Sequence, residues 1–438
     1  MSTKKSVKKQ SEMKTEAEIN SDEIPFKIPD NWKWVRLSSL ADIYTGNSIN
    51  EEEKKKKYTG LSSGYYYIAT KDISFNNEIN YDNGVRIPNS NTKFRIAPKN
   101  STLLCIEGGS AGRKIAITNQ DVCFVNKLCC FSPYGIDHIF LYYYLQTPTF
   151  FFIFKKNING IIGGVGVNKL RDTILPLPPL EEQKLIVEKI ESEFQKIDNA
   201  LNKLNIIKEQ IKQYKQSVLK YAFDENNSFA KGSNYEPYEW EEKILDDVCY
   251  INPTTIIPED FNDDTEVSFL PMANVEACTN NYTENIEKYQ KVKKGYTKFQ
   301  ENDILFAKIT PCMENGKICV INKLKSKIGF GSTEFHVIRN KDNVFIDFIY
   351  YFLSSEEFRM NAKQKMTGAV GQKRVQAGYL INHIIKLPNI ELQKTIADNI
   401  QNIFDKVDNI ENNINENIDK LNVLKQAVLK KAFEGKLI

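Results

Sequence analysis

Apolar residues recur at every seventh position along two long segments of this sequence. The two rows have five members each: Ile190, Ile197, Leu204, Ile211 and Val218, then Ile400, Val407, Ile414, Leu421 and Val428. This spacing is typical of a helix whose apolar seam packs along another helix. Each segment follows a proline and contains no further proline or glycine before its end, which predicts an unbroken helix of about 43 residues, about 64 Å long. We expect the two helices to pair antiparallel, because that arrangement buries both seams within one chain.

The two segments belong to a longer internal repeat. Residues 177–223 match residues 387–433 at a constant offset of 210, with 20 identities in 47 positions and no gap. Three weaker matches lie outside the helices: NWKWVRLSSLADI (31–43) with EWEEKILDDVCYI (239–251), YIATKDI (67–73) with FLPMANV (269–275), and IFLYYYL (139–145) with DFIYYFL (347–353). A long repeat organises the whole fold. Each half is therefore expected to be one globular domain followed by one long helix.

The globular parts have the pattern of mixed α and β domains. Five short β-rich runs lie between Gly, Asn and Asp turns: STLLCIEG (101–108), RKIAIT (113–118), DILFAKIT (303–310), GKICVIN (316–322) and EFHVI (334–338). The aromatic segments FLYYYL and FIYYFL, with the segments TPTFFFIF and SSEEFRMNA after them, are better explained as helices. The predicted fold class is α+β: two globular α/β domains alternate with two long helices that pair as an antiparallel coiled coil, with pseudo-two-fold symmetry.

These patterns also predict the boundaries between the parts of the chain. The predicted parts are a flexible N-terminal tail (1–22), a first domain (23–175), a helix with a linker (176–234), a second domain (235–385) and a second helix (386–438). A chain of 438 residues with 41% hydrophobic residues can bury a sizeable core in each half.

Composition excludes several classes of protein. No apolar run approaches the roughly 20 residues that span a bilayer, and the segment MSTKKSVKKQ lacks the apolar core of a signal peptide. We therefore expect a soluble, cytoplasmic protein. The eight cysteines form no CxxC pair, so reduced and mostly buried thiols are favoured over a metal site or a redox pair.

Positive charge is concentrated locally, although the net charge is only +3. Residues 23–175 hold 19 Lys and Arg against 13 Asp and Glu, and residues 288–327 hold ten Lys against three acidic residues. A surface that binds a polyanion requires such local concentration.

With this two-fold layout, the chain resembles the specificity (S) subunits of type I restriction-modification systems, the HsdS family. The resemblance extends from about residue 32 to 438 and rests on LPLPPLEEQK and KLPNIELQK with their helices, LKQAVLKKAFEGKL, TGAVGQKRV (367–375), STEF (332–335) and YIATKDI. The first-half counterpart of TGAVGQKRV is NGIIGGVGVNKL (159–170), which is also rich in Gly but lacks the GQxR signature.

The resemblance implies a non-catalytic subunit that recognises a split sequence in double-stranded DNA. Each globular domain would read one half-site in the major groove, and the helices would fix the distance between the half-sites. The implied partners are two methyltransferase (M) subunits and up to two restriction (R) subunits, in a system of phage defence and DNA methylation. No cofactor is expected on this chain; S-adenosylmethionine, ATP and Mg would be bound by the partner subunits.

The candidate DNA contacts are basic and polar residues in turns and short loops. Lys and Arg position a protein on phosphates, whereas polar and Arg contacts to base edges specify sequence. The first domain offers Lys54, Lys55, Lys56, Lys57, Tyr65, Tyr66, Lys71, Gly109, Ser110, Arg113 and Lys114. The second domain offers Lys291, Lys293, Lys294, Tyr296, Lys298, Lys308, Asn315, Lys317, Gln372, Lys373 and Arg374. For any single lysine, a solvated surface charge is the alternative.

The ends of the two helices carry the same cassette, YKQSVLKYAF (214–223) and LKQAVLKKAF (424–433). Its polar residues are expected to be exposed and to form docking faces for two copies of one partner, the M subunit. These residues are Lys215, Gln216, Lys220, Lys425, Gln426 and Lys430.

The sequence contains no recognisable catalytic or metal-binding motif. His138, His336 and His383 are far apart in the sequence and in no HExxH spacing. GGSAGRK (108–114) has the wrong length for a P-loop, and NPTT (252–255) lacks the second Pro and the aromatic residue of an adenine methyltransferase motif. No catalytic residue and no metal ligand is therefore assigned. The alternative function is a coiled-coil scaffold that binds other proteins without sequence-specific DNA binding.

Overall fold

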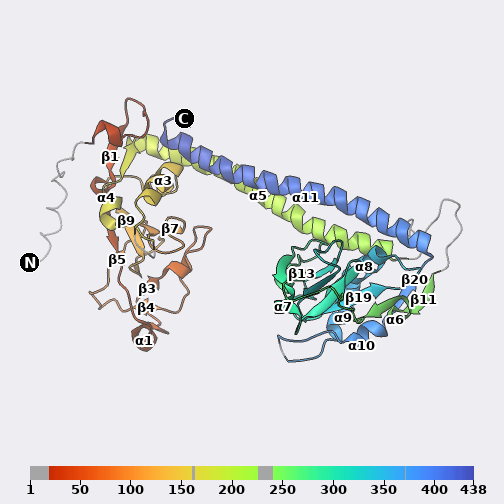
Figure 1. The fold of residues 1–438 in the computed structure, drawn as a ribbon. Helices are drawn as coiled ribbons and strands as arrows, with labels where there is room; N and C mark the ends of the chain where they lie inside the picture. Colours follow the sequence, from red (N-terminus) through yellow and green to blue (C-terminus); the bar gives the residue numbers. More distant parts are fainter. Residues whose placement is uncertain (1–18, 160–162, 225–239, 370) are drawn as a thin grey trace, which may run out of the picture. The chain divides into compact units, whose positions relative to one another are not determined.

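The computed structural model describes residues 19–159, 163–224, 240–369 and 371–438 (Figure 1). It divides into two compact units. Unit 1 comprises Met1–Lys203 and Glu416–Ile438, and unit 2 comprises Leu204–Asn415. Most of the predicted tail and the predicted linker after the first helix lie outside the described residues; Ser21–Glu23 forms a short 3-10 helix.

The described residues of unit 1 form three small sheets. The first pairs β1 (Lys33–Arg36) with β10 (Ile174–Leu177). The second has the order β2 (Ala41–Thr45), β9 (Leu128–Pro133), β6 (Thr102–Cys105) and β7 (Ile115–Ile117). The third has the order β4 (Arg86–Ile87), β3 (Tyr65–Ile68), β8 (Val122–Phe124) and β5 (Ile96–Ala97), and its β3–β8 pair is parallel. The helices of this unit include α1 (Glu51–Glu53), α2 (His138–Tyr144), α3 (Pro148–Lys156) and α4 (Val167–Arg171).

Unit 2 repeats this topology strand for strand. Its sheets are β11 (Glu241–Ile244) with β20 (Ile384–Leu387); β12 (Cys249–Ile251), β19 (Phe335–Asn340), β16 (Asp303–Ala307) and β17 (Ile318–Val320); and β14 (Asn285–Lys288), β13 (Glu266–Leu270), β18 (Ile328–Gly331) and β15 (Thr297–Gln300). Its helices include α6 (Leu245–Val248), α7 (Tyr289–Val292), α8 (Ile346–Ser354), α9 (Glu356–Gln364) and α10 (Ala377–Ile381). The β13–β18 pair is parallel, like β3–β8. The predicted internal repeat and the α+β class are confirmed.

Both predicted long helices are present and unbroken. They are α5 (Leu180–Ala222, 43 residues) and α11 (Ile390–Phe433, 44 residues). A buried glutamine in the first turn ties each helix to its domain. Gln183 accepts a hydrogen bond from the Asp137 N–H, and Gln393 accepts one from the Phe345 N–H, both at 2.9 Å. The glutamine shared by LEEQK and IELQK therefore marks a structural joint.

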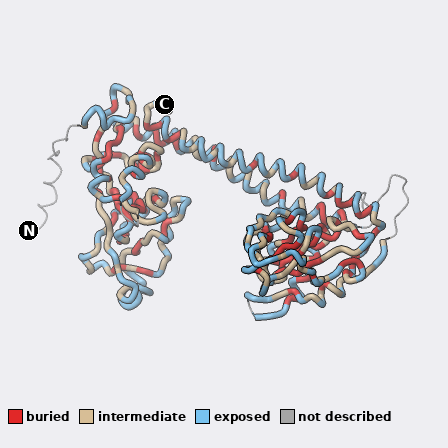
Figure 2. Tube along the Cα trace, in the orientation of Figure 1, coloured by how far each residue is buried: buried red, intermediate tan, exposed pale blue. Residues whose placement is uncertain are grey.

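Within each unit the two long helices run antiparallel. Lys425 Nζ lies 2.5 Å from Asp198 Oδ1 in unit 1, and Lys215 Nζ lies 2.5 Å from Asp408 Oδ1 in unit 2. Eight of the ten heptad positions are buried, while Leu204 and Leu421 are half-buried. Figure 2 shows short buried segments between exposed ones along the helices. The predicted antiparallel coiled coil is confirmed.

The end of each long helix also belongs to a domain core. In unit 1, Phe433 is 2% exposed and its ring centroid lies 4.6 Å from that of Phe140. In unit 2, the equivalent Phe223 lies 5.1 Å from Phe348. The repeated cassette thus contributes apolar residues that complete the two cores.

None of the described helices is both long and apolar enough to cross a membrane. Six of the eight cysteines are buried, while Cys312 is half-buried and Cys278 is exposed.

Candidate functional site

The predicted DNA contacts of unit 1 fall into two separate groups. The first group lies around the loop 108–114, which connects β6 to β7. Its close neighbour is the 3-10 turn Thr70–Asp72, because Lys114 Nζ donates to the Thr70 carbonyl at 3.0 Å. Lys71, Gly109, Ser110, Arg113 and Lys114 are therefore brought together.

The second group of unit 1 contains the four-lysine run and the β3 tyrosines. The run forms a helical turn (Lys54–Tyr58) directly after α1. Lys54 and Lys57 lie 3.2 Å from Glu51 and Glu53, so part of the run's charge is compensated locally, while Lys55 and Lys56 complete the turn. Tyr65 and Tyr66 are half-buried, and the Arg86 guanidinium lies over the Tyr66 ring at 3.9 Å from its centroid.

The predicted DNA contacts of unit 2 also fall into two groups. The residues of the first group lie in α7, in β15 and in the segment between them. Lys291 pairs with Glu287 at 2.9 Å, and Lys293 pairs with Asp263 at 2.8 Å. The Tyr296 ring packs edge-to-face on Phe269. Lys294 is exposed and Lys298 is half-buried, so only part of this predicted group presents an uncompensated surface.

The second group of unit 2 surrounds the loop 367–374. The loop is closed by a backbone bridge between Thr367 and Arg374, and the Thr310 N–H donates to the Lys373 carbonyl at 2.9 Å. The Val375 N–H donates to the Lys308 carbonyl, also at 2.9 Å. Gln372, Lys373 and Asn315 are exposed, so the structure gathers this half of the predicted residues at the end of β16.

Arg374, which was predicted to contact DNA, is held in an ion pair within the protein. Its Nε and Nη2 donate to the two carboxylate oxygens of Glu334 at 2.9 and 2.8 Å, and this guanidinium holds the pKa of Glu334 below its usual range. Such a bidentate pair fixes geometry. In unit 1, Lys127 occupies the place of Glu334 and pairs with Glu107 at 3.4 Å, while Gly164 stands at the place of Arg374. The structure therefore indicates a clamp that holds the loop against β19.

This geometry predicts that Glu334→Gln and Arg374→Ala have the same effect on DNA affinity. Both changes open the clamp, so each is expected to weaken binding several-fold, and the double variant is expected to be no weaker than either single one. The measurement is a duplex titration at fixed salt with all three variants. If Arg374 instead contacts phosphate, Glu334→Gln would release it and tighten binding.

Lys114 and Lys317 also have structural partners. Lys114 donates to the Thr70 carbonyl, and Lys317 donates to the Met272 carbonyl at 2.8 Å, at the same place in the repeated topology. Both side chains are half-buried. They tie the loop after the central strand to the neighbouring 3-10 turn in each unit.

The helix-end lysines correct the prediction of an exposed docking face. The Lys215 side chain is 13% exposed and the Lys425 side chain 25% exposed, and both are paired across the two helices. Sequence reasoning could not see this, because their carboxylate partners are 193 and 227 residues away. Lys220, Gln426 and Lys430 are exposed, as expected.

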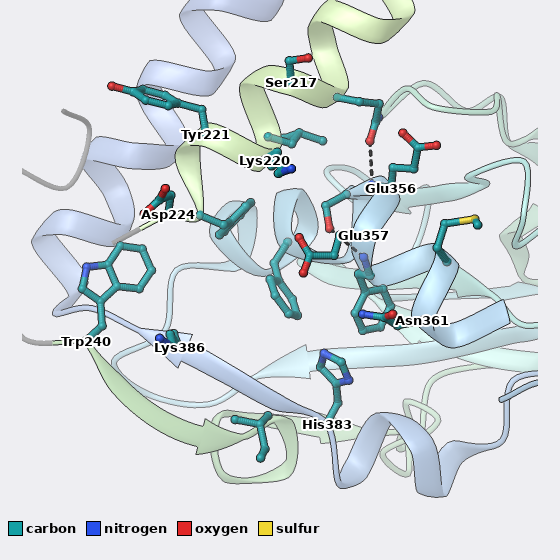
Figure 3. A pocket seen from close by; sticks show the side chains of 18 of the residues that line it. Ser217, Lys220, Tyr221, Asp224, Trp240, Glu356, Glu357, Asn361, His383 and Lys386 are labelled. Carbon is teal, nitrogen blue, oxygen red and sulfur yellow. Dashed lines mark hydrogen bonds between the residues drawn. The ribbon is translucent and has the colours of Figure 1, made fainter. Parts of the chain in front are cut away.

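A hollow of about 1180 Å³ lies beside the cassette in unit 2 (Figure 3). The end of α5, α9 and β20 line it, and Gln216 and Lys220 are among its residues. The Gln216 side chain accepts a hydrogen bond from the Glu356 N–H at 2.7 Å. Trp240 Nε1 has no hydrogen-bond partner among the described residues, whereas Trp32 Nε1 in unit 1 donates to Glu182.

Sequence reasoning missed an exposed aromatic residue beside the loop 108–114. Phe75 is 58% exposed, and both Arg113 and Lys114 lie over its ring, about 5 Å from the centroid. The signal was present as a single phenylalanine in the polar segment SFNNE. Among the described residues, no cluster of three or more His, Cys, Asp or Glu side chains is placed to hold a metal ion.

The fold and these loops define a duplicated protein with two α+β units, an antiparallel helix pair and a basic loop group in each unit. The chain belongs to the family of the type I restriction modification DNA specificity domain, whose family model matches residues 29–213 and 237–420. The family predicted from the sequence is thereby confirmed.

Curated relatives and solved structures agree with this assignment. The chain is 32% identical to the EcoAI specificity subunit of Escherichia coli over 58% of this chain and 42% of that subunit, so the match spans less than half of that relative. It is 25% identical to the EcoBI specificity subunit of E. coli over 94% of this chain and 87% of that subunit.

Two solved structures share the fold. A chain of a type I restriction-modification system covers 94% of this chain and 100% of its own length, with a TM-score of 0.70 and 17% identity. The HsdS subunit from Thermoanaerobacter tengcongensis covers 94% of this chain and 99% of its own length, with a TM-score of 0.53 and 19% identity.

Proposed function

We propose that this chain is the DNA-recognition subunit of a type I restriction-modification complex. The observation that carries the proposal is the duplicated match to the DNA specificity domain, once in each half of the chain. Each unit supplies exposed polar or basic groups in its loops, as a reader of two half-sites requires: Arg113 in unit 1, and Asn315, Gln372 and Lys373 in unit 2.

The two units read the two halves of a bipartite target. Because they belong to one chain, binding of the first half-site makes binding of the second intramolecular, which converts two modest affinities into one tight affinity. The paired helices α5 and α11 set the distance between the half-sites. This role follows from their unbroken length and from the interhelical pairs Lys425–Asp198 and Lys215–Asp408.

The chain supplies recognition, and its partners supply the chemistry. Two M subunits dock at the two helix ends, where Lys220 in unit 2 and Gln426 and Lys430 in unit 1 are exposed. The hollow beside Gln216 and Lys220 extends this docking face in unit 2. S-adenosylmethionine is bound by the M subunits, and ATP and Mg by up to two R subunits.

The test is reconstitution of the full chain with its cognate M subunit and S-adenosylmethionine. We expect methylated adenines at a bipartite sequence with a constant gap, none with either protein alone, and a complex mass that corresponds to two M subunits per chain. Methylation by this chain alone, a continuous target or a variable gap would contradict the proposal.

The competing function is a coiled-coil scaffold that binds only proteins, and the interhelical pairing is compatible with it. The discriminating property is the salt dependence of duplex binding, since neutralised phosphates release counterions and make log K fall linearly with log salt. A steep slope with a specific duplex excludes the scaffold; no measurable duplex binding favours it.

A further inference from the structure

Arg113 differs from the other arginines of the chain. The sequence contains eight arginines, and seven of their side chains donate a hydrogen bond to a protein oxygen in the structure: Arg36, Arg86, Arg95, Arg171, Arg339, Arg359 and Arg374. The exposed Arg113 side chain has no hydrogen bond or ion pair with any described residue. Its five N–H donors are thus left available for an external acceptor.

The neighbour of Arg113 is Phe75, whose ring centroid lies 5.0 Å from the guanidinium carbon. The segment that carries Phe75 is fixed by its own hydrogen bonds. Ser74 Oγ accepts from the N–H groups of Asn76 and Glu78, and the Asn77 side chain donates to Gln146 at 3.0 Å. An apolar ring that is 58% exposed is therefore held in place beside a free guanidinium.

The repeat within the chain allows this pair to be compared with its counterpart in unit 2. The anchor is common to both units, because Lys114 and Lys317 donate to equivalent carbonyls. In unit 2, Gly316 occupies the position that is equivalent to Arg113 in unit 1. Ala277, which bridges to Lys317, stands where unit 1 has Phe75. The support is therefore repeated, while the two residues presented on it differ, as is required of two domains that read different half-sites.

We propose that Phe75 and Arg113 together read adjacent base pairs in the half-site of unit 1; this inference rests on the proposed function. A guanidinium donates two hydrogen bonds to guanine O6 and N7, and an apolar ring contacts the thymine methyl group, both in the major groove. Bases stack about 3.4 Å apart along a strand, and the two groups are 5.0 Å apart, which is close enough for them to face neighbouring base pairs and too close for them to face distant ones. The half-site of unit 1 then contains a guanine next to a thymine.

The experiment uses the full chain with its M subunit, and maps methylated adenines genome-wide for the wild type and for Phe75→Ala, Arg113→Ala and Arg113→Lys. Arg113→Ala is expected to reduce discrimination for guanine at one position by about tenfold or more, and Phe75→Ala to relax the neighbouring thymine. Arg113→Lys keeps the charge but loses the bidentate fork, so it is expected to relax guanine as well. Phe152→Ala, at a 70% exposed phenylalanine of α3, is the matched control and leaves the target unchanged.

The affected half-site must be the one that persists when residues 235–385 are exchanged for another recognition domain. An unchanged target in both alanine variants overturns the inference. So does a uniform loss of methylation without altered base preference, or full rescue by Arg113→Lys, because each indicates a phosphate contact only. A wild-type complex that methylates no bipartite target instead overturns the proposed function, so the two failures are distinguishable.

Discussion

Replacing Phe433 with alanine is expected to destabilise unit 1 by about 3 to 5 kcal/mol, the usual cost of removing a buried phenylalanine. Phe433 lies near the end of α11, is 2% exposed and packs on Phe140 and Tyr144 in the core of unit 1. Calorimetry of the full chain should show a lowered transition for unit 1. Limited proteolysis should then cut first within residues 33–177, far from the substitution in the sequence.

The repeat supplies a matched control for this experiment. Phe223 is the equivalent residue, directly after the end of α5, and it packs on Phe348 and Phe352 in unit 2. Phe223→Ala is therefore expected to lower the transition of unit 2 and leave residues 33–177 protected. If Phe433→Ala lowers the transition of unit 2 instead, the assignment of the helix ends to the two cores is wrong.

Asp303→Ala is expected to cost unit 2 about 3 to 5 kcal/mol, because it leaves one partner of a buried ion pair without compensation. Asp303 is fully buried, and both of its carboxylate oxygens accept hydrogen bonds from Arg339 at 2.7 Å. It also accepts the Gln300 N–H at 2.8 Å. Chemical denaturation of the full chain, followed by a probe in unit 2, measures the loss.

The second variant needed is the double substitution Asp303→Leu with Arg339→Met. Apolar replacement of both partners removes the uncompensated charge, so it is expected to recover much of the lost stability. A single variant as stable as the wild type would show that the pair contributes little. A double variant no better than Asp303→Ala would show that the carboxylate matters chiefly for its hydrogen bond to Gln300.

The helices and most strands could be predicted because their signals are local. The heptad rows fixed α5 and α11, and β-rich runs between turn residues marked strands such as β6 and β16. The parallel β3–β8 pair carries no comparable signal. Its register joins Tyr66 to Val122, more than 50 residues apart, and no turn connects them directly.

The candidate site shows the same limit. Sequence reasoning identified the charged residues of the loops, but it did not identify the residues with which they form ion pairs. Arg374 pairs with Glu334 across 40 residues, and Lys215 pairs with Asp408 across 193. Phe75 became a candidate site residue only from the structure, which places its ring beside Arg113. Basic patterns therefore predicted which loops and helix ends carry charge, and tertiary structure decided which of those side chains pair with other residues of the chain.

The contribution of α11 to unit 1 has a consequence for biosynthesis. A polypeptide leaves the ribosome from its N-terminus onward, and domains generally fold as units in that order. Here the first domain to leave the ribosome lacks Val428, Leu429, Ala432 and Phe433, which belong to its core. These residues are translated only after all of unit 2. The first domain thus completes its core last. A polypeptide that ends after unit 2 would therefore lack part of the core of its first domain.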